Sequence, residues 1–229
     1  MNRKTVANQL PRFVAPMLAK AGRPFDSADY LFEIKWDGTR VLAAIDRGGY
    51  WLINRHGRER TEQYPEFAFL REFPAGTLLD GEMIVLEGGK PAFGKLLTRE
   101  QTQDPLKIRM LARSLPAVYV AFDLLYADYE PLFEQPLERR RERLQKLVED
   151  HEGSAIVFSA GVVGQGRAFF EKACREGLEG VVAKRRGSRY RPGKRTDAWI
   201  KIKPRNGAES IVRGELLGAA ARCFKKRIL

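Results

Sequence analysis

Apolar and charged side chains alternate between Phe32 and Asp37, and no other feature restricts the fold of this chain as strongly. With the two-residue period of a β-strand, one face carries Phe32, Ile34 and Trp36, and the other carries Glu33, Lys35 and Asp37. Lys35 is therefore held between two carboxylates on a strand whose opposite face is apolar. Gly38 permits a sharp turn and Arg40 begins a second apolar run, so the segment predicts a β-hairpin. Taken alone, the pattern is also typical of a half-buried strand with solvated charges.

Similar patterns extend over most of the chain. Two-residue spacing predicts strands over residues 50–58, 78–86, 118–126, 180–184 and 198–203, and helical spacing predicts helices over 65–73, 93–101, 137–149 and 166–176. Because strands and helices do not alternate regularly, this order indicates an α+β fold with mainly antiparallel sheets and flanking helices. We expect an irregular lead-in over residues 1–29, the folded domain over residues 30–204, and a basic tail over residues 205–229.

The chain carries a large excess of basic residues. Its 229 residues, enough for one large domain, include 41 Lys and Arg against 29 Asp and Glu, which gives a net charge of +12. This excess favours a polyanionic partner, first of all nucleic acid. No apolar run approaches the ~20 residues of a membrane-spanning helix, and residues 1–20 lack the apolar region of a signal peptide. We therefore expect a cytoplasmic protein with no membrane partner.

The Lys35 segment forms a motif that has companions further along the chain. Lys35-Trp36-Asp37-Gly38-Thr39-Arg40 is similar to the nucleotidyl-transfer motif of ATP-dependent DNA ligases, RNA ligases and mRNA capping enzymes. Five further stretches match the remaining motifs in the family's order: Asn54–Gly57, Asp80–Glu82, Phe122–Asp123, Glu179–Lys184, and Arg195 with Trp199–Lys203. The resemblance covers about residues 10–205 and looks closest to the ligase module of bacterial non-homologous end-joining ligases.

This resemblance implies a nucleotidyltransferase fold, as in DNA ligases and mRNA capping enzymes, and a role for each matching residue. Lys35 is implied as the nucleophile that takes AMP from ATP and passes it to the 5′-phosphate of nicked or broken double-stranded DNA, for strand sealing in DNA repair. The implied contacts are Glu33 to adenine, Arg40 and Arg55 to the nucleotide and the 5′-phosphate, Glu82 to ribose and metal, Phe122 stacked on the base, Glu179 to metal, and Arg195, Lys201 and Lys203 to phosphates. The implied cofactors are ATP and Mg²⁺ or Mn²⁺, and the implied location is the bacterial cytosol or nucleoid.

The chemistry of Lys35 makes demands on its surroundings. An amine that attacks phosphorus must be neutral, although an unperturbed lysine has a pKa of about 10.4. Lys201 and Lys203 alternate with two isoleucines, so both ammonium groups leave one face of their strand. If that face meets Lys35, the two cations favour its neutral form and also bind triphosphate, while the neighbouring carboxylates act in the opposite direction. Glu82 and Glu179 offer the hard oxygen ligands that Mg²⁺ or Mn²⁺ needs for an in-line displacement of pyrophosphate.

Basic residues concentrate near the end of the predicted domain. Between Lys184 and Arg205 there are ten basic residues and one acid. The loop residues predicted to contact the phosphates of a duplex, with Tyr190 interleaved, are Arg185, Arg186, Arg189 and Arg191. The alternative is a solvated basic loop, and a strand-end lysine such as Lys184 is often only solvated.

Other functions also fit these motifs. An RNA ligase or a GTP-using capping enzyme has the same chemistry, and a catalytically weak nucleic-acid-binding module would share the fold. The complete set of Lys35, Glu82, Glu179 and Lys201 favours an active enzyme. The family normally continues into an OB-fold domain, and the 26 residues after Lys203 are too few for one. We therefore expect slow self-adenylation and inefficient nick sealing unless a separate OB-type domain or a Ku-like end-binding protein acts as partner.

Overall fold

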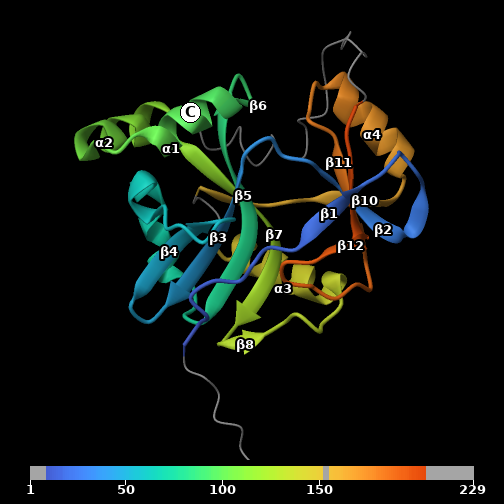
Figure 1. The fold of residues 1–229 in the computed structure, drawn as a ribbon, viewed down its shortest axis with the longest axis horizontal. Coiled ribbons are helices and arrows are strands. Elements are labelled where there is room, and N and C mark those ends of the chain that lie inside the picture. The colour runs from blue at the N-terminus through green and yellow to red at the C-terminus, as the bar shows by residue number, and fades with distance from the viewer. Residues whose placement is uncertain (1–8, 152–154, 205–229) are drawn as a thin grey trace, which may run out of the picture.

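The computed structural model describes residues 9–151 and 155–204, and the tail predicted over residues 205–229 lies outside this range. Two β-sheets lie side by side, with helices on their outer surfaces and ends (Figure 1). Most neighbouring strands are antiparallel, which confirms the predicted α+β fold with mainly antiparallel sheets and flanking helices.

The larger sheet contains seven strands in the order β4-β3-β5-β7-β8, with β6 paired to β5 and β9 paired to β7. Its strands are β3 (Thr39–Asp46), β4 (Gly49–Asn54), β5 (Thr77–Glu87), β6 (Lys90–Pro91), β7 (Ala117–Ala127), β8 (Glu130–Pro131) and β9 (Ile156–Phe158). Only β7 and β9 run parallel among these pairs. The long central strands β5 and β7 are buried along most of their length, as their apolar runs predict.

The smaller sheet contains five strands in the order β1-β12-β11-β2-β10. They are β1 (Leu18–Ala21), β2 (Ser27–Ile34), β10 (Gly161–Gly164), β11 (Val181–Arg185) and β12 (Arg195–Ile202). The pair β1 and β12 is parallel, and the other pairs are antiparallel. This sheet therefore brings the segment around Lys35 next to the last strands of the described chain.

The helices are η1 (Thr61–Gln63), η2 (Pro65–Glu72), α1 (Phe93–Gln101), α2 (Pro105–Ser114), α3 (Leu137–Glu149) and α4 (Gly166–Arg175). α3 contacts β7 and β9, whereas α4 contacts β2, β10 and β11 of the smaller sheet. The helix predicted from Pro65 is a 3₁₀ helix, whose three-residue turn fits the spacing of Phe67, Leu70 and Phe73. The helix α2 was not predicted from the sequence, although Asp104 caps the N-terminus of this helix by accepting the Lys107 N–H.

The predicted β-hairpin around Gly38 is wrong. β2 pairs with β10 and β11 in the smaller sheet, whereas β3 pairs with β4 and β5 in the larger one. Residues 35–38 therefore cross from one sheet to the other. The glycine is needed for close packing, because a Cβ atom at Gly38 would lie 2.2 Å from the Met83 carbonyl oxygen of β5.

The predicted irregular lead-in over residues 1–29 is also corrected. It contains β1, and β2 begins within it at Ser27. The backbone N–H of Leu18 donates to the Lys194 carbonyl at 2.9 Å, and the Gly193 N–H donates to Ala15 at 2.8 Å. β1 has little apolar periodicity of its own, so pairing with a distant strand rather than local pattern decides its conformation.

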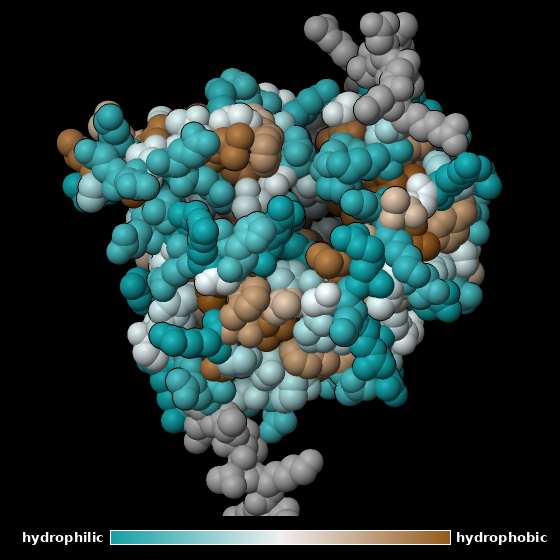
Figure 2. All heavy atoms as spheres, viewed as in Figure 1, coloured by the Kyte–Doolittle hydropathy of each residue, from teal (hydrophilic) through white to brown (hydrophobic). Residues whose placement is uncertain are grey.

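Apolar side chains join the two sheets. One buried cluster contains Leu42 and Leu78 from the larger sheet together with Phe122, and it reaches Trp199 of β12 and Tyr190. In Figure 2, hydrophilic side chains surround the region where the sheets meet, and hydrophobic ones show within it. The junction between the sheets therefore has an apolar floor and a charged rim.

Candidate active site

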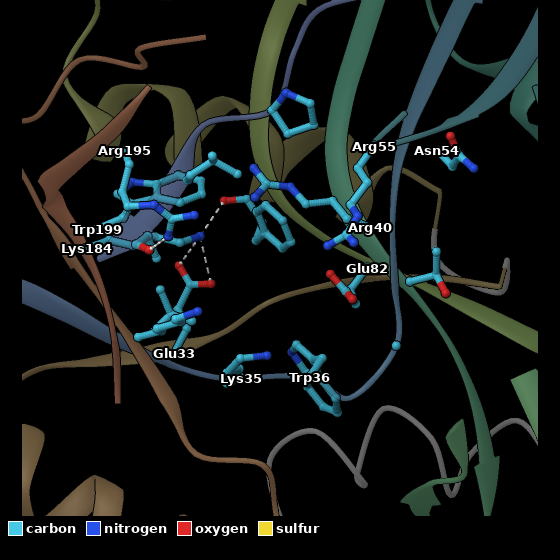
Figure 3. A pocket seen from close by; sticks show the side chains of 18 of the residues that line it. Glu33, Lys35, Trp36, Arg40, Asn54, Arg55, Glu82, Lys184, Arg195 and Trp199 are labelled. Atoms are coloured by element: carbon cyan, nitrogen blue, oxygen red, sulfur yellow. Dashed lines mark hydrogen bonds and ion pairs between the residues drawn. The ribbon is translucent and has the colours of Figure 1, made fainter. Parts of the chain in front are cut away.

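A cleft of about 890 Å³ opens between the two sheets (Figure 3). Its walls come from the end of β2 and the crossing after it, from the turn after β4, and from β5, β7, β11 and β12. The residues predicted to form a site that line this cleft are Glu33, Lys35, Arg40, Arg55, Glu82, Phe122, Arg195 and Lys201. Side chains that are far apart in the sequence thus meet around one cavity.

Lys35 is held at the cleft by both its backbone and its side chain. Its N–H donates to the Gly180 carbonyl at 2.9 Å, and its Nζ lies 2.5 Å from Oε2 of Glu179. The other carboxylate oxygen of Glu179 pairs with Lys203. Burial by itself raises the pKa of Glu179. Hydrogen bonds from Lys203 and from Lys35 outweigh this effect and hold the pKa of Glu179 below its ordinary value.

This arrangement differs from the expectation that Lys201 and Lys203 both meet Lys35 directly. Lys201 lines the cleft as expected, but Lys203 approaches Lys35 only through the shared carboxylate of Glu179. The Lys35 amine is thus engaged by a carboxylate, and attack on phosphorus requires that this contact be given up. A positive charge arriving at Glu179 would weaken this hold on the amine.

Glu82 enters the same cleft from β5. Burial, opposed by the nearby charges of Arg40 and Lys35, raises the pKa of Glu82 to about 8, and repulsion from Glu179 adds to the rise. Within the described residues its carboxylate has no hydrogen-bond partner. A buried carboxylate without a hydrogen-bond partner is well suited to bind a cation that neutralises its charge.

The pair of carboxylates beside Lys35 fits a divalent cation that also binds other oxygen ligands. Glu82 and Glu179 are close enough to influence each other electrostatically, and both offer hard oxygens. Across the part of the chain that the structure describes, no three His, Cys, Asp or Glu side chains gather closely enough to hold an ion by themselves. Phosphate and water oxygens would complete the coordination, as is common for Mg²⁺.

Arg55 and Arg195 stand on the rim of the cleft (Figure 3). Oδ1 of Asn54 accepts the backbone N–H groups of His56 and Arg58, each at 3.0 Å, and this fixes the turn that presents Arg55. Arg195 donates to the carbonyl of Ala19 in β1. Both guanidinium groups are exposed and can reach an anion entering the cleft.

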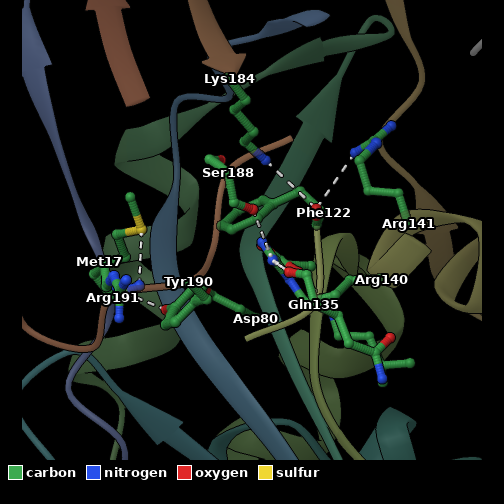
Figure 4. Close-up of polar contacts among 12 residues, drawn as sticks. Met17, Asp80, Phe122, Gln135, Arg140, Arg141, Lys184, Ser188, Tyr190 and Arg191 are labelled. Carbon is green, nitrogen blue, oxygen red and sulfur yellow. Dashed lines mark hydrogen bonds and ion pairs between the residues drawn. The ribbon is translucent and has the colours of Figure 1, made fainter. Parts of the chain in front are cut away.

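Arg40 mainly holds the wall of the cleft together. It donates to both oxygens of Asp80, at 2.8 and 2.5 Å, and to the Met17 carbonyl at 2.7 Å. Tyr190 donates to the same carboxylate at 2.7 Å (Figure 4). Since most of its donors are occupied, Arg40 has little capacity left for a phosphate. Tyr190 is fully buried, so its predicted position among duplex contacts is wrong.

A buried group of charges closes one end of the cleft. Glu33 is 2% exposed and accepts from Arg141 at 2.6 Å, from Lys184 at 3.0 Å and from Ser159 at 2.9 Å. Lys184 is also 2% exposed, so the expectation that this lysine is solvated is wrong. Burial, opposed by the charge of Glu33, lowers the pKa of Lys184. Its Nζ lies 4.3 Å from the ring centre of Phe122.

The sequence analysis missed Arg141 as a site residue. A signal was present, because Arg141 shares a helical stripe with Leu137, Leu144 and Val148, all of which are buried in α3. The neighbouring Arg140 is also fully buried. A charged residue on an apolar stripe requires a buried partner, and here that partner comes from β2.

The four arginines predicted to contact DNA from a loop are exposed and lie outside the cleft, but Arg185 is the last residue of β11 and not part of a loop. Arg189 and Arg191 share Glu134 at 2.7 and 3.2 Å. Arg185 donates to a tyrosine hydroxyl at 3.0 Å, and Arg186 lies 3.7 Å from a glutamate. Exposed ion pairs contribute only about 0–1 kcal/mol, so these contacts leave the arginines available to phosphate.

Comparisons with known proteins agree with this geometry. A family model described as ATP dependent DNA ligase domain matches residues 15–203. The chain is 34% identical over 224 residues to the multifunctional non-homologous end joining protein LigD of Mycolicibacterium smegmatis, covering 96% of this chain and 27% of that protein. It is 33% identical over 204 residues to the SPbeta prophage-derived DNA ligase-like protein LigB of Bacillus subtilis, covering 88% of this chain and 72% of that protein.

A solved structure shares the fold as well. The structure titled mycobacterial DNA ligase D complexed with ATP and MES superposes with a TM-score of 0.69 at 34% identity, covering 83% of this chain and 60% of that one. The chain thus spans about a quarter of the LigD protein that it matches, and 72% of the LigB protein. None of the helices within the described residues is long and apolar enough to cross a bilayer. From the motif order, the cleft and these matches, the chain belongs to the family of ATP-dependent DNA ligase domains.

Proposed function

We propose that Lys35 is the nucleophile of an adenylation module that joins DNA strands. Its Nζ forms a bond to the α-phosphorus of ATP while the bond to pyrophosphate breaks, and the amine loses a proton. The AMP is then transferred to a DNA 5′-phosphate, which frees Lys35, and a 3′-hydroxyl displaces AMP to seal the strand. The observation that carries this proposal is the contact of Lys35 with Glu179 at the wall of a cleft that also holds Glu82.

Glu179 controls the position of the Lys35 amine in this proposal. The ion pair of 2.5 Å keeps the amine in place before the nucleotide arrives. A divalent cation, Mg²⁺ or Mn²⁺, held by Glu82 and Glu179 would neutralise charge on the triphosphate and on the departing pyrophosphate. Engaged in that way, Glu179 would release its contact with Lys35, and the amine would be free to turn toward the α-phosphate.

The nucleotide is expected to lie with its base toward the closed end of the cleft and its phosphates toward the rim. Phe122 and the Glu33 cluster form the base end, where the environment is apolar and buried. Arg195 and Lys201 supply positive charge for the phosphates from the cleft, and Lys203 supplies it from its contact with Glu179. Arg55 stands across the rim and is suited to the DNA 5′-phosphate. We assign Arg40 to shaping the wall, given its occupied donors.

Double-stranded DNA with a nick or a break is the proposed substrate, and Arg185, Arg186, Arg189 and Arg191 are its proposed duplex contacts. Their present partners are exposed and easily exchanged. A Ku-like end-binding protein or a separate OB-type domain is a proposed partner for efficient sealing. A cytoplasmic location in the bacterial cytosol or nucleoid follows from this substrate.

Self-adenylation tests the proposal directly. The purified chain is incubated with ATP and Mg²⁺ and analysed by intact-mass spectrometry, with Lys35→Ala as the test variant. Lys107→Ala is the matched control, because Lys107 is exposed on α2 and lies outside the cleft. We expect an AMP adduct on the wild type and on the control, and none on Lys35→Ala. Adduct formation by Lys35→Ala would refute the assigned nucleophile, and preferential labelling by GTP would favour a capping-type enzyme.

A further inference from the structure

The buried charges at the closed end of the cleft leave Glu33 with no free acceptor capacity. A carboxylate offers about four lone-pair sites. Arg141 occupies one on Oε1 and Ser159 one on Oε2, while Lys184 lies 3.0 Å from both oxygens. A direct hydrogen bond from a base to this carboxylate would therefore displace a protein donor. The side chain of Glu33 is better placed to hold Arg141 and Lys184 than to contact a ligand.

Arg141 ties this cluster to three parts of the fold. From α3 it donates to Glu33 of β2 at 2.6 Å and to the Ser159 carbonyl at 2.6 Å. It also donates to the Phe122 carbonyl of β7 at 3.3 Å, the contact drawn in Figure 4. Its guanidinium also stacks over the ring of Phe158, 4.5 Å from the ring centre. One side chain thus fixes the carboxylate and the strand that carries Phe122.

Lys184 connects the buried Glu33 to the aromatic residues that line the cleft. Its ammonium lies 4.3 Å from the ring centre of Phe122 and 4.5 Å from that of Trp199, and both aromatic residues line the cleft. Trp199 is 2% exposed, and its indole Nε1 finds no hydrogen-bond acceptor within the described residues. Two aromatic rings with one cation beside them, at the closed end of the cleft, point to a base-binding end.

We propose that Arg141 is a positioning residue that sets the affinity and the selectivity of the cleft for the purine base. It does so by fixing Glu33 and, through it, the ammonium of Lys184 beside the rings of Phe122 and Trp199. This inference rests on the proposed function, since it takes the nucleotide base to lie at that end. The ligand class is a purine nucleotide, with adenine preferred over guanine.

The neighbouring Arg140 provides a matched comparison on the same helix. It is fully buried and donates to Asp123 at 2.7 and 2.9 Å, so it is an equally enclosed arginine in an ion pair. Its other partners are the carbonyls of Gln135 and Ser188. Neither Arg140 nor Asp123 lines the cleft. Loss of Arg140 should therefore affect folding without affecting the choice of base.

The test measures ATP and GTP binding by calorimetry in the Lys35→Ala background, where no covalent step follows. Arg141→Met is expected to weaken ATP binding at least tenfold, about 1.4 kcal/mol, and to reduce the preference for ATP over GTP. Arg141→Lys can donate to Glu33 or to the Ser159 carbonyl but not to both. It should therefore recover part of the ATP affinity and part of the preference for ATP over GTP, which shows that the losses in Arg141→Met do not come from misfolding. Arg140→Lys should lower the melting temperature and leave both dissociation constants unchanged.

The outcomes separate this inference from the proposed chemistry. Unchanged ATP affinity and unchanged ATP-to-GTP preference in both Arg141 variants would overturn the positioning role. An equal shift in Arg140→Lys would do the same, because it would assign the effect to general loss of packing. Self-adenylation of the wild type is measured in parallel, and its absence despite ATP binding would refute the nucleophile while leaving Arg141 as a base-positioning residue.

Discussion

Replacing Gly38 by alanine tests whether the crossing between the two sheets positions Lys35. A Cβ atom at this position would lie 2.2 Å from the Met83 carbonyl oxygen and 2.9 Å from Cγ of Glu82. Ordinary contacts begin near ~3.4 Å, so the crossing or β5 must move by about 1 Å. The same movement would change the separation of Lys35 from Glu82.

Two magnitudes follow from this displacement. Overpacking of a dense interior typically costs about 1–3 kcal/mol, which leaves a domain with roughly 5–15 kcal/mol of stability folded. A misplacement of about 1 Å at reacting groups costs about 10²-fold in rate. We therefore expect Gly38→Ala to stay folded at 25 °C, to lose about 1–3 kcal/mol of unfolding free energy, and to self-adenylate about 10²-fold more slowly.

Urea denaturation measures the first quantity, and single-turnover labelling with ATP and Mg²⁺ measures the second. Gly48→Ala is the matched control, because the nearest atom to its new Cβ would be Cη2 of Trp51, at an ordinary 3.8 Å. It should match the wild type in both assays. Wild-type labelling and wild-type stability in Gly38→Ala would refute the reasoning, since the crossing would then tolerate a side chain without moving either group.

Three further predictions concern cations and DNA. Because burial raises the pKa of Glu82 to about 8 from an ordinary 4.5, a divalent cation competes with a proton at lower pH. The affinity for Mg²⁺, measured by thermal shift, should therefore rise up to about tenfold per pH unit between about pH 6 and 8 and level off above. Glu82→Gln should abolish this rise. A flat profile for the wild type would contradict the prediction. Glu179→Gln should slow self-adenylation about 10²-fold while changing metal-free ATP binding less than about threefold, and unaltered labelling would argue against its role. Replacing Arg189 and Arg191 by alanine should reduce the salt dependence of duplex binding by about two phosphate contacts. Glu134→Ala frees both arginines and should tighten duplex binding. Anisotropy titrations measure both effects, and no change in either variant would show that these arginines do not contact DNA.

The sequence predicts elements well where the signal is long and local. The helices over residues 93–101 and 137–149 have the predicted bounds, because their apolar stripes repeat over two or more turns. The strands β5 and β7 follow from long apolar runs. The residues that a family resemblance singled out include Lys35, Glu82 and Lys201, which line the cleft, but also Glu179 and Lys203, which are not among its lining residues.

Pairing between distant segments was not predictable in the same way. The alternation around Lys35 shows that a strand is present, but the same pattern fits a hairpin partner or a strand from the end of the domain. Here β2 pairs with β11, and β3 turns away into the other sheet. The strand β1 depends wholly on such pairing, and the sequence analysis therefore missed it.

Buried charges were the second source of error. Arg141 was placed on an apolar stripe without a partner, and Lys184 had a solvated strand end as its alternative, because isolated charges are rarely buried. Their partner is Glu33, which lies 108 and 151 positions away in the sequence. Once the fold brings the three together, each cation gains the carboxylate that makes burial tolerable. Only a long-range contact distinguishes this arrangement from a solvated helix face and strand end.

The central claim is that one amine, chosen by its place beside Glu179, takes AMP from ATP. Peptide mapping of the chain after reaction with ATP and Mg²⁺ tests it most directly, because it locates the adduct among the lysines of the cleft. We predict AMP on the peptide that contains Lys35 and on no other. An adduct on Lys184, Lys201 or Lys203 in place of Lys35 would contradict the account.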